Sequence, residues 1–415
     1  MGGERTRADR QAQHTDPRSI AITDLTYALP EDRIAQHPLA ERDAAKLLVH
    51  REGEITDRRF TNLPEELPGN TLLVLNDTRV VHARIAFRRS TGALIECMVL
   101  SPALDRPMEE ALNRTSPVRW WCMMGNAKRW KGEELLSEKE GHSLKAERKD
   151  LRDGEHLIEF SWEGEGAFID QLDHFGDVPL PPYMRRAVEP SDDRRYNTVF
   201  GIHPGSVAAP TASLHFTPEM MEAIAQKGIA TSRVTLHVGA GTFLPVKSTT
   251  MRDHAMHSEQ VRVPRSTVET LLGQIGKGPI VPVGTTAMRT IESLYWFGAE
   301  VANGNDPAQL DVEQWRPYAD APLVNAGKAL KSVLAWLDRH DLDTVAGSTR
   351  LLIAPGYEFR LADGLITNFH QPRSTLLLLV AALIGTEWRN IYAHALAHGY
   401  RFLSYGDGSL LWRKT

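Results

Sequence analysis

The chain has 415 residues, of which 42% are hydrophobic, 24% charged and 7% aromatic, a composition typical of a globular protein with two or three domains. Its 48 Lys and Arg against 53 Asp and Glu give a formal net charge of −5, which excludes a polycation that holds nucleic acid by overall charge. Two cysteines, Cys97 and Cys122, without metal-ligand spacing exclude a disulfide framework and suit a reducing cytosol.

The N-terminal part contains a polar tail and then the first buried strands. Residues 1–20 lack the apolar segment of a signal peptide, so we expect a disordered tail. Continuous apolar runs at 46–49 and 72–75 predict strands, and the second run stops at the turn residues 76–78. Residues 21–78 therefore begin an α/β domain.

The next hundred residues have the pattern of antiparallel strands. Short segments alternate apolar and polar residues between Gly-, Pro- and charge-rich turns; they span 80–87, 93–100, 118–124, 144–147 and 156–162. This spacing predicts a small β-barrel over residues 79–175, inserted into the α/β domain.

From residue 176 to 415 the α/β pattern returns. Thr217 and Pro218 have the cap and first-turn preferences of a helix start, and a strand follows at 234–238. A strand at 280–283 contains Pro282, which favours an edge or a bulge. Helices are expected at 287–297, 330–337, 376–384 and 391–398, with a surface insertion at 302–325. The predicted fold is a mixed-sheet α/β domain with an inserted antiparallel β-barrel. The longest apolar run, 376–384, is about half of a membrane helix, so no membrane partner is expected.

Two glycine or threonine turns could bind an anion. Gly239 and Gly241, followed by Thr242, can bring backbone N–H groups against a ligand, although a hairpin turn explains them equally well. Thr285 and Thr286 lie between a strand and a helix, where free N–H groups favour a carboxylate, with an ordinary helix cap as the alternative. Arg289, one turn into that helix, would lie near the same anion.

Several histidines and carboxylates could transfer protons. His257 and Glu259 form a candidate acid/base pair; with His254 they could instead bind a metal, but a third strong ligand is not obvious and no metal site is expected. His394 and His398 are interpreted as surface residues. Polar loops supply further candidates, each with a structural role as the alternative: Asp77, Thr211, His215, Asn368, His370, Arg373 and Asp407.

In the barrel segment, basic and aromatic residues are also interspersed along the chain. Lys128, Arg129 and Trp130 could form a local RNA surface, since aromatic faces stack bases and cations hold phosphates. A buried core position for the tryptophan is the default interpretation.

These segments together resemble the S-adenosylmethionine:tRNA ribosyltransferase-isomerases of queuosine biosynthesis. The resemblance runs in family order from about residue 24 to the C-terminus. Its matching blocks are 34–38, 74–80, 179–183, 208–217, 235–243, 256–259, 283–289, 367–377 and 400–407.

The resemblance implies a reaction in which the ribosyl part of S-adenosylmethionine moves to 7-aminomethyl-7-deazaguanine at the tRNA wobble position. Rearrangement would give an epoxycyclopentane, with release of adenine and methionine. S-adenosylmethionine would be a cosubstrate, so no resident cofactor is expected. The partner would be a tRNA anticodon loop, and we expect a cytoplasmic monomer.

The resemblance and the residue types give a hypothesis of roles. His215, His257 and His370 would shuttle protons, with Asp77, Glu259 and Asp407 as bases or orienting groups. The cosubstrate would contact Thr211, Gly239, Gly241, Thr242, Thr285, Thr286 and Arg289. The RNA would meet Arg79, Asn368, Arg373, Lys128, Arg129 and Trp130.

Five positions differ from the usual family pattern. They are Ser213, Asn197, Gln371, Gly408 and Ser409, and the insertion at 302–325 is extra. These differences leave open a paralogue with a changed RNA substrate. A non-catalytic tRNA-binding protein and a metal-dependent hydrolase are the alternatives from other classes.

Overall fold

The computed structural model describes residues 16–103, 106–152, 154–239, 241, 246, 248–320 and 322–414. Most of the predicted tail, residues 1–15, lies outside the described residues, while Pro17–Ser19 forms a short 3-10 helix. The chain divides into two compact units. The α/β unit comprises residues 1–76, 211–236 and 244–415, and the barrel unit comprises 77–210 and 237–243.

A six-stranded mixed sheet forms the centre of the α/β unit. Its order is β15 (Ile280–Pro282), β3 (Leu72–Asn76), β13 (Ala230–Leu236), β14 (Glu259–Pro264), β17 (Thr344–Thr349) and β16 (Leu310–Val312). β15, β3 and β13 run parallel, and β14 is antiparallel to both of its neighbours. β15 is an edge strand, as Pro282 predicted, because proline cannot donate to a second neighbour.

A second sheet of four strands completes the α/β unit. Its order is β18 (Gly364–Asn368), β19 (Gly408–Trp412), β1 (Lys46–Arg51) and β2 (Glu54–Arg59). A single parallel bridge between Val283 and Ile366 links the residue after β15 to β18. The ends of β3, β15 and β18 are therefore brought close together.

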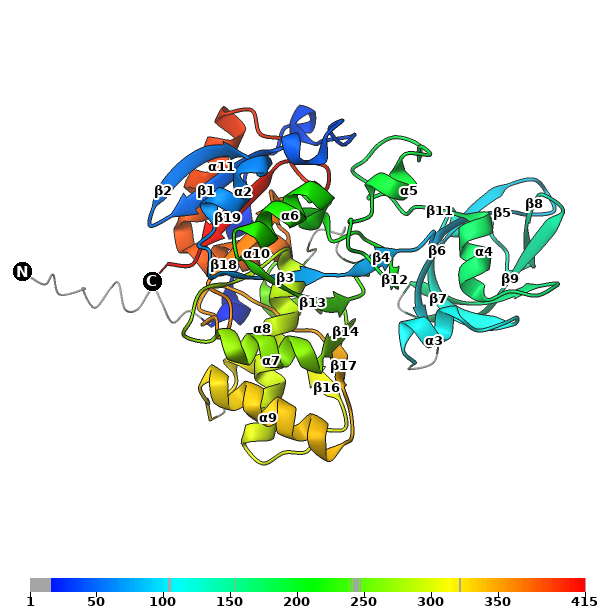
Figure 1. Cartoon of the computed structure of the whole chain (residues 1–415). Helices are drawn as coiled ribbons and strands as arrows, with labels where there is room; N and C mark the ends of the chain where they lie inside the picture. The colour runs from blue at the N-terminus through cyan, green and yellow to red at the C-terminus, as the bar shows by residue number, and fades with distance from the viewer. Residues whose placement is uncertain are drawn as a thin grey trace, which may run out of the picture. The chain divides into compact units, whose positions relative to one another are not determined.

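Helices cover these sheets, and α8 (Thr285–Ala302) is buried on almost every face. α9 (Ala326–Arg339) packs against α8 and against α7 (Arg265–Gln274), as Figure 1 shows. α6 (Pro218–Gln226) begins at the predicted cap, where the Thr217 hydroxyl accepts a hydrogen bond from the Met220 N–H at 3.2 Å. α2 (Leu63–Glu66) is a short helix before β3.

The C-terminal helices α10 (Thr375–Ile384) and α11 (Trp388–Ala397) pack beside the four-stranded sheet. Among the described residues, one helical stretch, Thr375–Ala397, has the length and composition to cross a membrane, with a mean hydropathy of 1.3. Since 56% of its most apolar window is buried within the protein, this is weak evidence for a membrane span, and a core helix has the same properties.

The barrel unit has the predicted antiparallel barrel. Its strands are β5 (Arg84–Arg88), β6 (Leu94–Pro102), β7 (Val118–Gly125), β10 (Glu155–Trp162), β9 (His142–Arg152) and β8 (Leu135–Lys139), closed by pairing of β5 with β8. Alternate residues of β10 are buried, which is why the sequence alternates there. Phe168 of α4 (Phe168–Phe175) packs on Trp120 in the barrel core, where both free cysteines are also buried.

Shorter elements flank the barrel. These are the parallel pair β4 (Thr78–Val80) and β12 (His203–Ser206), β11 (Gly176–Asp177), α3 (Met108–Leu112) and α5 (Asp192–Arg195). Residues 176–210, which the sequence assigned to the α/β domain, belong to the barrel unit together with 237–243.

The insertion at 302–325 is not confined to the surface. It contains β16, which pairs with β17 and buries Leu310 and Val312. The Gly-, Asn- and Asp-rich composition conceals this strand because only three of its residues are in the sheet.

Candidate active site

Asn76 joins three elements at the edge of the six-stranded sheet. From the end of β3, its amide donates to the Leu236 carbonyl of β13 at 3.0 Å and to the Thr286 hydroxyl of α8 at 3.2 Å. Its side-chain oxygen accepts the Leu236 N–H at 3.0 Å. This buried amide fixes the start of α8 against the strand ends.

The N-terminus of α8 carries the two predicted anion-binding threonines. Thr285 and Thr286 lie in its first turn and are buried, and Gly284 precedes them with φ 91°. Among the described residues, no side chain caps this end of the helix. The first-turn N–H groups therefore have the polarity that favours an anion.

Arg289 lies one turn further along α8 and is buried against β14. Its guanidinium forms an ion pair with the Glu259 carboxylate and donates to the Leu351 carbonyl at 3.2 Å. Its second terminal nitrogen is buried with no hydrogen-bond partner among the described residues. Glu259 thus compensates the charge of Arg289 in the core.

The expected pairing of His257 with Glu259 is not found. Glu259 points to Arg289 from β14, whereas His257 precedes that strand and is exposed. Burial lowers the pKa of the half-buried His254, with a smaller effect from neighbouring His257. Among the described residues, the trio of His254, His257 and Glu259 does not form a group at metal-ligand distance.

A second polar group joins Thr211, His215 and Asn368. The Thr211 hydroxyl donates to the Asn368 side-chain oxygen at 2.8 Å, and the Asn368 amide lies 3.4 Å from His215 Nε2. His215 Nδ1 lies 3.4 Å from the Arg42 carbonyl, and Phe60 packs on the imidazole with ring centroids 4.7 Å apart. Burial lowers the pKa of His215 to about 4, so its ring is neutral at pH 7.

Asn368 was predicted to face RNA, but its side chain is buried. It ends β18, and both of its amide atoms are directed to Thr211 and His215. The structure therefore places Asn368 with the proton-transfer candidates rather than at an exposed surface.

His370 is enclosed by structural hydrogen bonds. Its Nε2 lies 2.9 Å from the Thr367 hydroxyl, and its backbone binds the hydroxyls of Tyr27 and Tyr392. Burial lowers its pKa to about 3. Its neutral ring is held within the loop before α10.

Asp407 has its carboxylate occupied by the backbone. One oxygen accepts the Lys46 N–H at 2.9 Å and the other accepts the Arg401 N–H at 2.7 Å. Burial raises its pKa, although these two N–H groups oppose the shift. This arrangement anchors β1 to the turn before β19.

The remaining candidates near Asp77 lie in the barrel unit. Asp77 is buried with its carboxylate 3.9 Å from His203, and Arg79 of β4 is exposed. Thr78 contacts His237 Nδ1 at 2.9 Å, a contact that the sequence did not suggest. Gly239 and Gly241 belong to this unit, and Thr242 lies outside the described residues.

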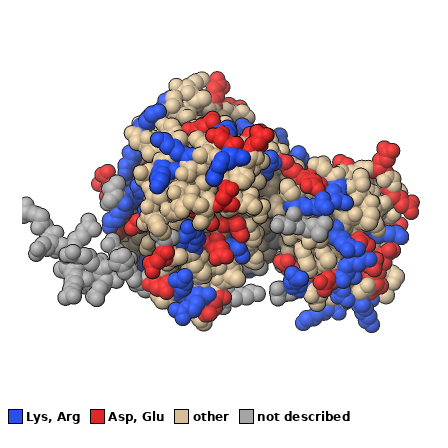
Figure 2. Space-filling view, turned by 90° about the horizontal axis from the view of Figure 1, so that it is seen from below, with Lys and Arg blue, Asp and Glu red and all other residues tan. Residues whose placement is uncertain are grey.

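The three residues of the predicted RNA surface in the barrel differ in their exposure. Lys128 and Arg129 are exposed, whereas Trp130 belongs to the barrel core and donates from Nε1 to the Glu133 carbonyl at 2.7 Å. Arg148 and His156 lie against the Trp130 ring, which corresponds to the default interpretation of a buried core position. Arg373 is exposed, with φ 58°. Figure 2 shows basic and acidic residues interspersed on the drawn face.

The positions that differ from the usual family pattern have distinct environments. Ser213 is buried, and its hydroxyl has no partner among the described residues. Ser409 donates to the Thr367 carbonyl at 3.1 Å, and Asn197 accepts the Val80 N–H at 2.9 Å. A Cβ at Gly408 would lie 2.9 Å from Phe60, and Gln371 is half-buried.

Sequence reasoning missed Glu292, a fully buried carboxylate of α8. It accepts hydrogen bonds from the Tyr357 hydroxyl at 2.7 Å and from the N–H groups of Arg360, Leu361 and Ala362 at 3.0 Å each. Burial raises its pKa, and these donors oppose the shift. A charged residue within a helix that is apolar on most faces was the available signal.

Comparisons with known proteins agree over nearly the whole chain. A family model described as "Queuosine biosynthesis protein" matches residues 22–411. An S-adenosylmethionine:tRNA ribosyltransferase-isomerase of Azoarcus sp. (strain BH72) is 38% identical over 404 residues, covering 95% of this chain and 98% of that protein. The protein of the same name from Anaeromyxobacter dehalogenans (strain 2CP-C) is 38% identical over 401 residues, covering 95% and 100%.

One solved structure is also similar. The S-adenosylmethionine tRNA ribosyltransferase of Thermotoga maritima is 29% identical, covers 93% of this chain and 99% of that chain, and superposes with a TM-score of 0.45. On the match of the family model and the full-length relatives, this chain belongs to the queuosine biosynthesis protein family.

Proposed function

We propose that this protein is an S-adenosylmethionine:tRNA ribosyltransferase-isomerase. It transfers the ribosyl group of S-adenosylmethionine to 7-aminomethyl-7-deazaguanine at the wobble position of tRNA. The transferred group is rearranged to the epoxycyclopentane of epoxyqueuosine, and adenine and methionine leave. The observation that carries this proposal is the similarity to relatives of that name over 94–95% of the chain at 35–38% identity.

The start of α8 is the proposed site for the carboxylate of the cosubstrate. Its first-turn N–H groups have no side-chain cap from the part of the chain that the structure describes, and the Asn76 amide donates to the Thr286 hydroxyl at 3.2 Å. A buried helix N-terminus attracts an anion without needing a second charge. Arg289 is then a positioning residue, because its guanidinium is already paired with Glu259.

His215 is the proposed proton carrier. The reaction needs a base for the acidic proton next to the sulfonium and an acid that assists the departure of adenine. A neutral imidazole can accept that proton at a ring nitrogen and return it later. Among the candidate histidines, His215 has its ring between the Asn368 amide and a backbone carbonyl, whereas His370 is held by loop contacts. Asn368 and Thr211 would orient His215.

The RNA contacts are proposed for exposed basic residues. Lys128, Arg129, Arg79 and Arg373 are all exposed, and they would contact phosphates of the anticodon loop. A protein with free, buried cysteines that acts on tRNA is suited to the cytoplasm, and we propose that location and a monomeric state.

The test is incubation of the purified protein with S-adenosylmethionine and tRNA that carries the deazaguanine precursor. We expect adenine and methionine in equal amounts, and none with tRNA that lacks the precursor. Binding of both substrates without release would support a non-catalytic tRNA-binding protein or a paralogue with another RNA substrate. Release that requires an added metal would support the hydrolase alternative.

A further inference from the structure

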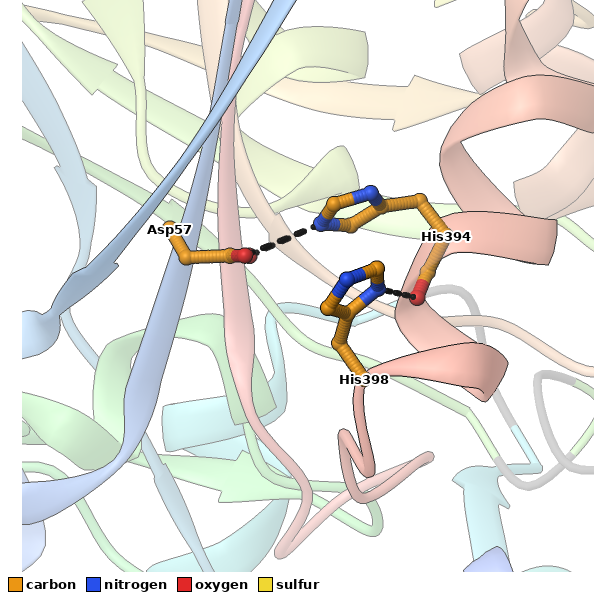
Figure 3. Close-up of side chains that lie close together, drawn as sticks. All are labelled: Asp57, His394 and His398. Atoms are coloured by element: carbon orange, nitrogen blue, oxygen red, sulfur yellow. Dashed lines mark hydrogen bonds and ion pairs between the residues drawn. The ribbon is translucent and has the colours of Figure 1, made fainter.

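Three metal-ligating side chains lie together outside the proposed active site. Asp57 is on β2, His394 is on α11, and His398 follows the end of that helix, as Figure 3 shows. Their ligand atoms all lie within 4.8 Å of one another. The two histidines are four residues apart on one helix face, with ring centroids 3.8 Å apart and planes inclined by 17°.

One hydrogen bond joins two of the ligand side chains directly, and two others orient His398 and Asp57. His394 Nε2 lies 3.0 Å from each carboxylate oxygen of Asp57. His398 Nδ1 lies 2.8 Å from the His394 carbonyl, so Nδ1 carries the hydrogen and Nε2 has a free lone pair. The Tyr400 hydroxyl donates to Asp57 at 2.5 Å and orients the carboxylate. Such outer hydrogen bonds are typical of metal ligands.

We propose that Asp57, His394 and His398 form a binding site for a divalent transition metal such as zinc. Two imidazole nitrogens and one carboxylate oxygen are ligands for zinc, copper or nickel, whereas calcium and magnesium prefer oxygen alone. Water would complete the coordination. In the absence of metal, the hydrogen bond between His394 and Asp57 occupies the same atoms.

The surroundings permit binding from solvent. Asp57 and His398 are exposed and His394 is half-buried, so an ion reaches the ligands without crossing the core. The positive charge of Lys46 lies nearby and opposes the binding of a cation. Its ammonium donates to the His398 carbonyl at 2.6 Å. That ammonium is engaged by the backbone and does not occupy the ligand atoms.

A bound ion would connect two elements that are distant in sequence. β2 is an edge strand of the four-stranded sheet, and α11 lies near the C-terminus. Because the ion binds only when both are in place, it should stabilise the folded state by mass action. The site is independent of the proposed reaction, since none of its residues is placed in the active site.

The test is calorimetric titration of the full chain, freed of any affinity tag and of metal, with zinc chloride. We expect one zinc site, weakened at least tenfold in His398→Ala and in Asp57→Asn. His340→Ala is the matched control, because His340 pairs with a single carboxylate, Asp306, at 3.1 Å. Zinc should raise the Tm of the wild type and the control, and leave the two site variants unchanged.

Two results would overturn the proposal. One is the absence of zinc binding by the wild type, and the other is equal binding by His398→Ala. His398 is exposed, so its truncation should leave the fold intact, which the Tm in the presence of a chelator would verify. Anomalous scattering at the zinc edge from soaked crystals should place the ion between Asp57 and the two histidines.

Discussion

Asn368 connects the hydroxyl of Thr211 to the imidazole of His215. Its side chain therefore orients both of these groups. Replacing it by alanine leaves His215 without its partner at Nε2. A lost hydrogen bond of this kind costs about 1–3 kcal/mol, which corresponds to roughly a 5- to 150-fold lower rate.

We therefore predict that Asn368→Ala slows adenine release while the protein stays folded. The measurement is tRNA-dependent adenine release, with the Tm as a check of folding. Gln371→Ala, in the loop that follows β18 and half-buried, is the matched control and should retain the wild-type rate. A wild-type rate in Asn368→Ala would contradict the role given to this side chain.

Gly408 makes room for the ring that packs on His215. A Cβ at this position would lie 2.9 Å from Phe60 and 3.8 Å from His215. We predict that Gly408→Ala destabilises the fold by about 1–3 kcal/mol, because Phe60 must move.

The measurement is urea denaturation of both glycine variants. Gly273→Ala is the control, since its Cβ would meet nothing within 4 Å on α7 and alanine is the better helix former. It should be neutral or slightly stabilising. Equal stability of Gly408→Ala and the wild type would show that Phe60 adjusts without cost.

At the scale of elements, α8 is held by a carboxylate in its middle. Glu292 binds the Tyr357 hydroxyl and three backbone N–H groups of the segment 360–362. Without it these donors would be buried and unpaired. We predict that Glu292→Ala lowers the free energy of unfolding by about 3 kcal/mol or more, and that Glu292→Gln has a smaller effect.

Chemical denaturation measures this difference directly. Glu300→Ala is the control on the same helix, half-buried and outside this network, and should change stability by less than about 0.5 kcal/mol. A change in stability for Glu292→Ala as small as that for Glu300→Ala would contradict the prediction. The donors of the segment 357–362 would then have to find other hydrogen-bond acceptors.

The elements also show what local sequence patterns determine. The strand at 72–75, the cap at Thr217 and the alternation of the barrel strands depend on neighbouring residues, and the structure confirms them. The sequence patterns did not predict β16 and β8. Each strand is short, and each contains charged or polar residues on one of its faces. The partner of Glu259 could not be predicted, because Arg289 reaches it only through the pairing of distant strands and α8.

The same limit applies to the candidate site. The turn at Thr285 and Thr286 and the helix after it were predicted from their order in the chain, although α8 begins at Thr285, two residues before the predicted start at 287. The grouping of Thr211, His215 and Asn368 requires β18 and the 3-10 helix Thr211–His215 to meet, which residue order alone does not show. Burial of Trp130 likewise depends on closure of the barrel.

At the scale of the whole molecule, two buried histidines make stability depend on pH. Burial lowers the pKa of His215 to about 4 and that of His370 to about 3, below an ordinary value near 6.5. Below pH 6.5 the unfolded state binds protons that the folded state does not. Stability is therefore present above pH 6.5 and is lost as the pH falls toward the folded pKa values.

We predict that each histidine contributes a loss of about 1 kcal/mol per pH unit between pH 6 and pH 4. The measurement is urea denaturation across this range for the wild type and His370→Gln. The variant should lose stability less steeply than the wild type as the pH falls. Parallel curves for the two proteins would mean that His370 is not buried in its neutral form.

The central claim is that the ribosyl group, and not the methyl group, of S-adenosylmethionine is transferred to tRNA. The most direct measurement uses two preparations of S-adenosylmethionine, carbon-13 labelled in the ribose or in the methyl group, with tRNA that carries the deazaguanine precursor. Mass spectrometry of the digested nucleosides should find the ribose label in the modified wobble nucleoside, accompanied by free adenine, and no methyl label. Methyl label in the tRNA, or no label from either preparation although both substrates bind, would contradict the proposed reaction.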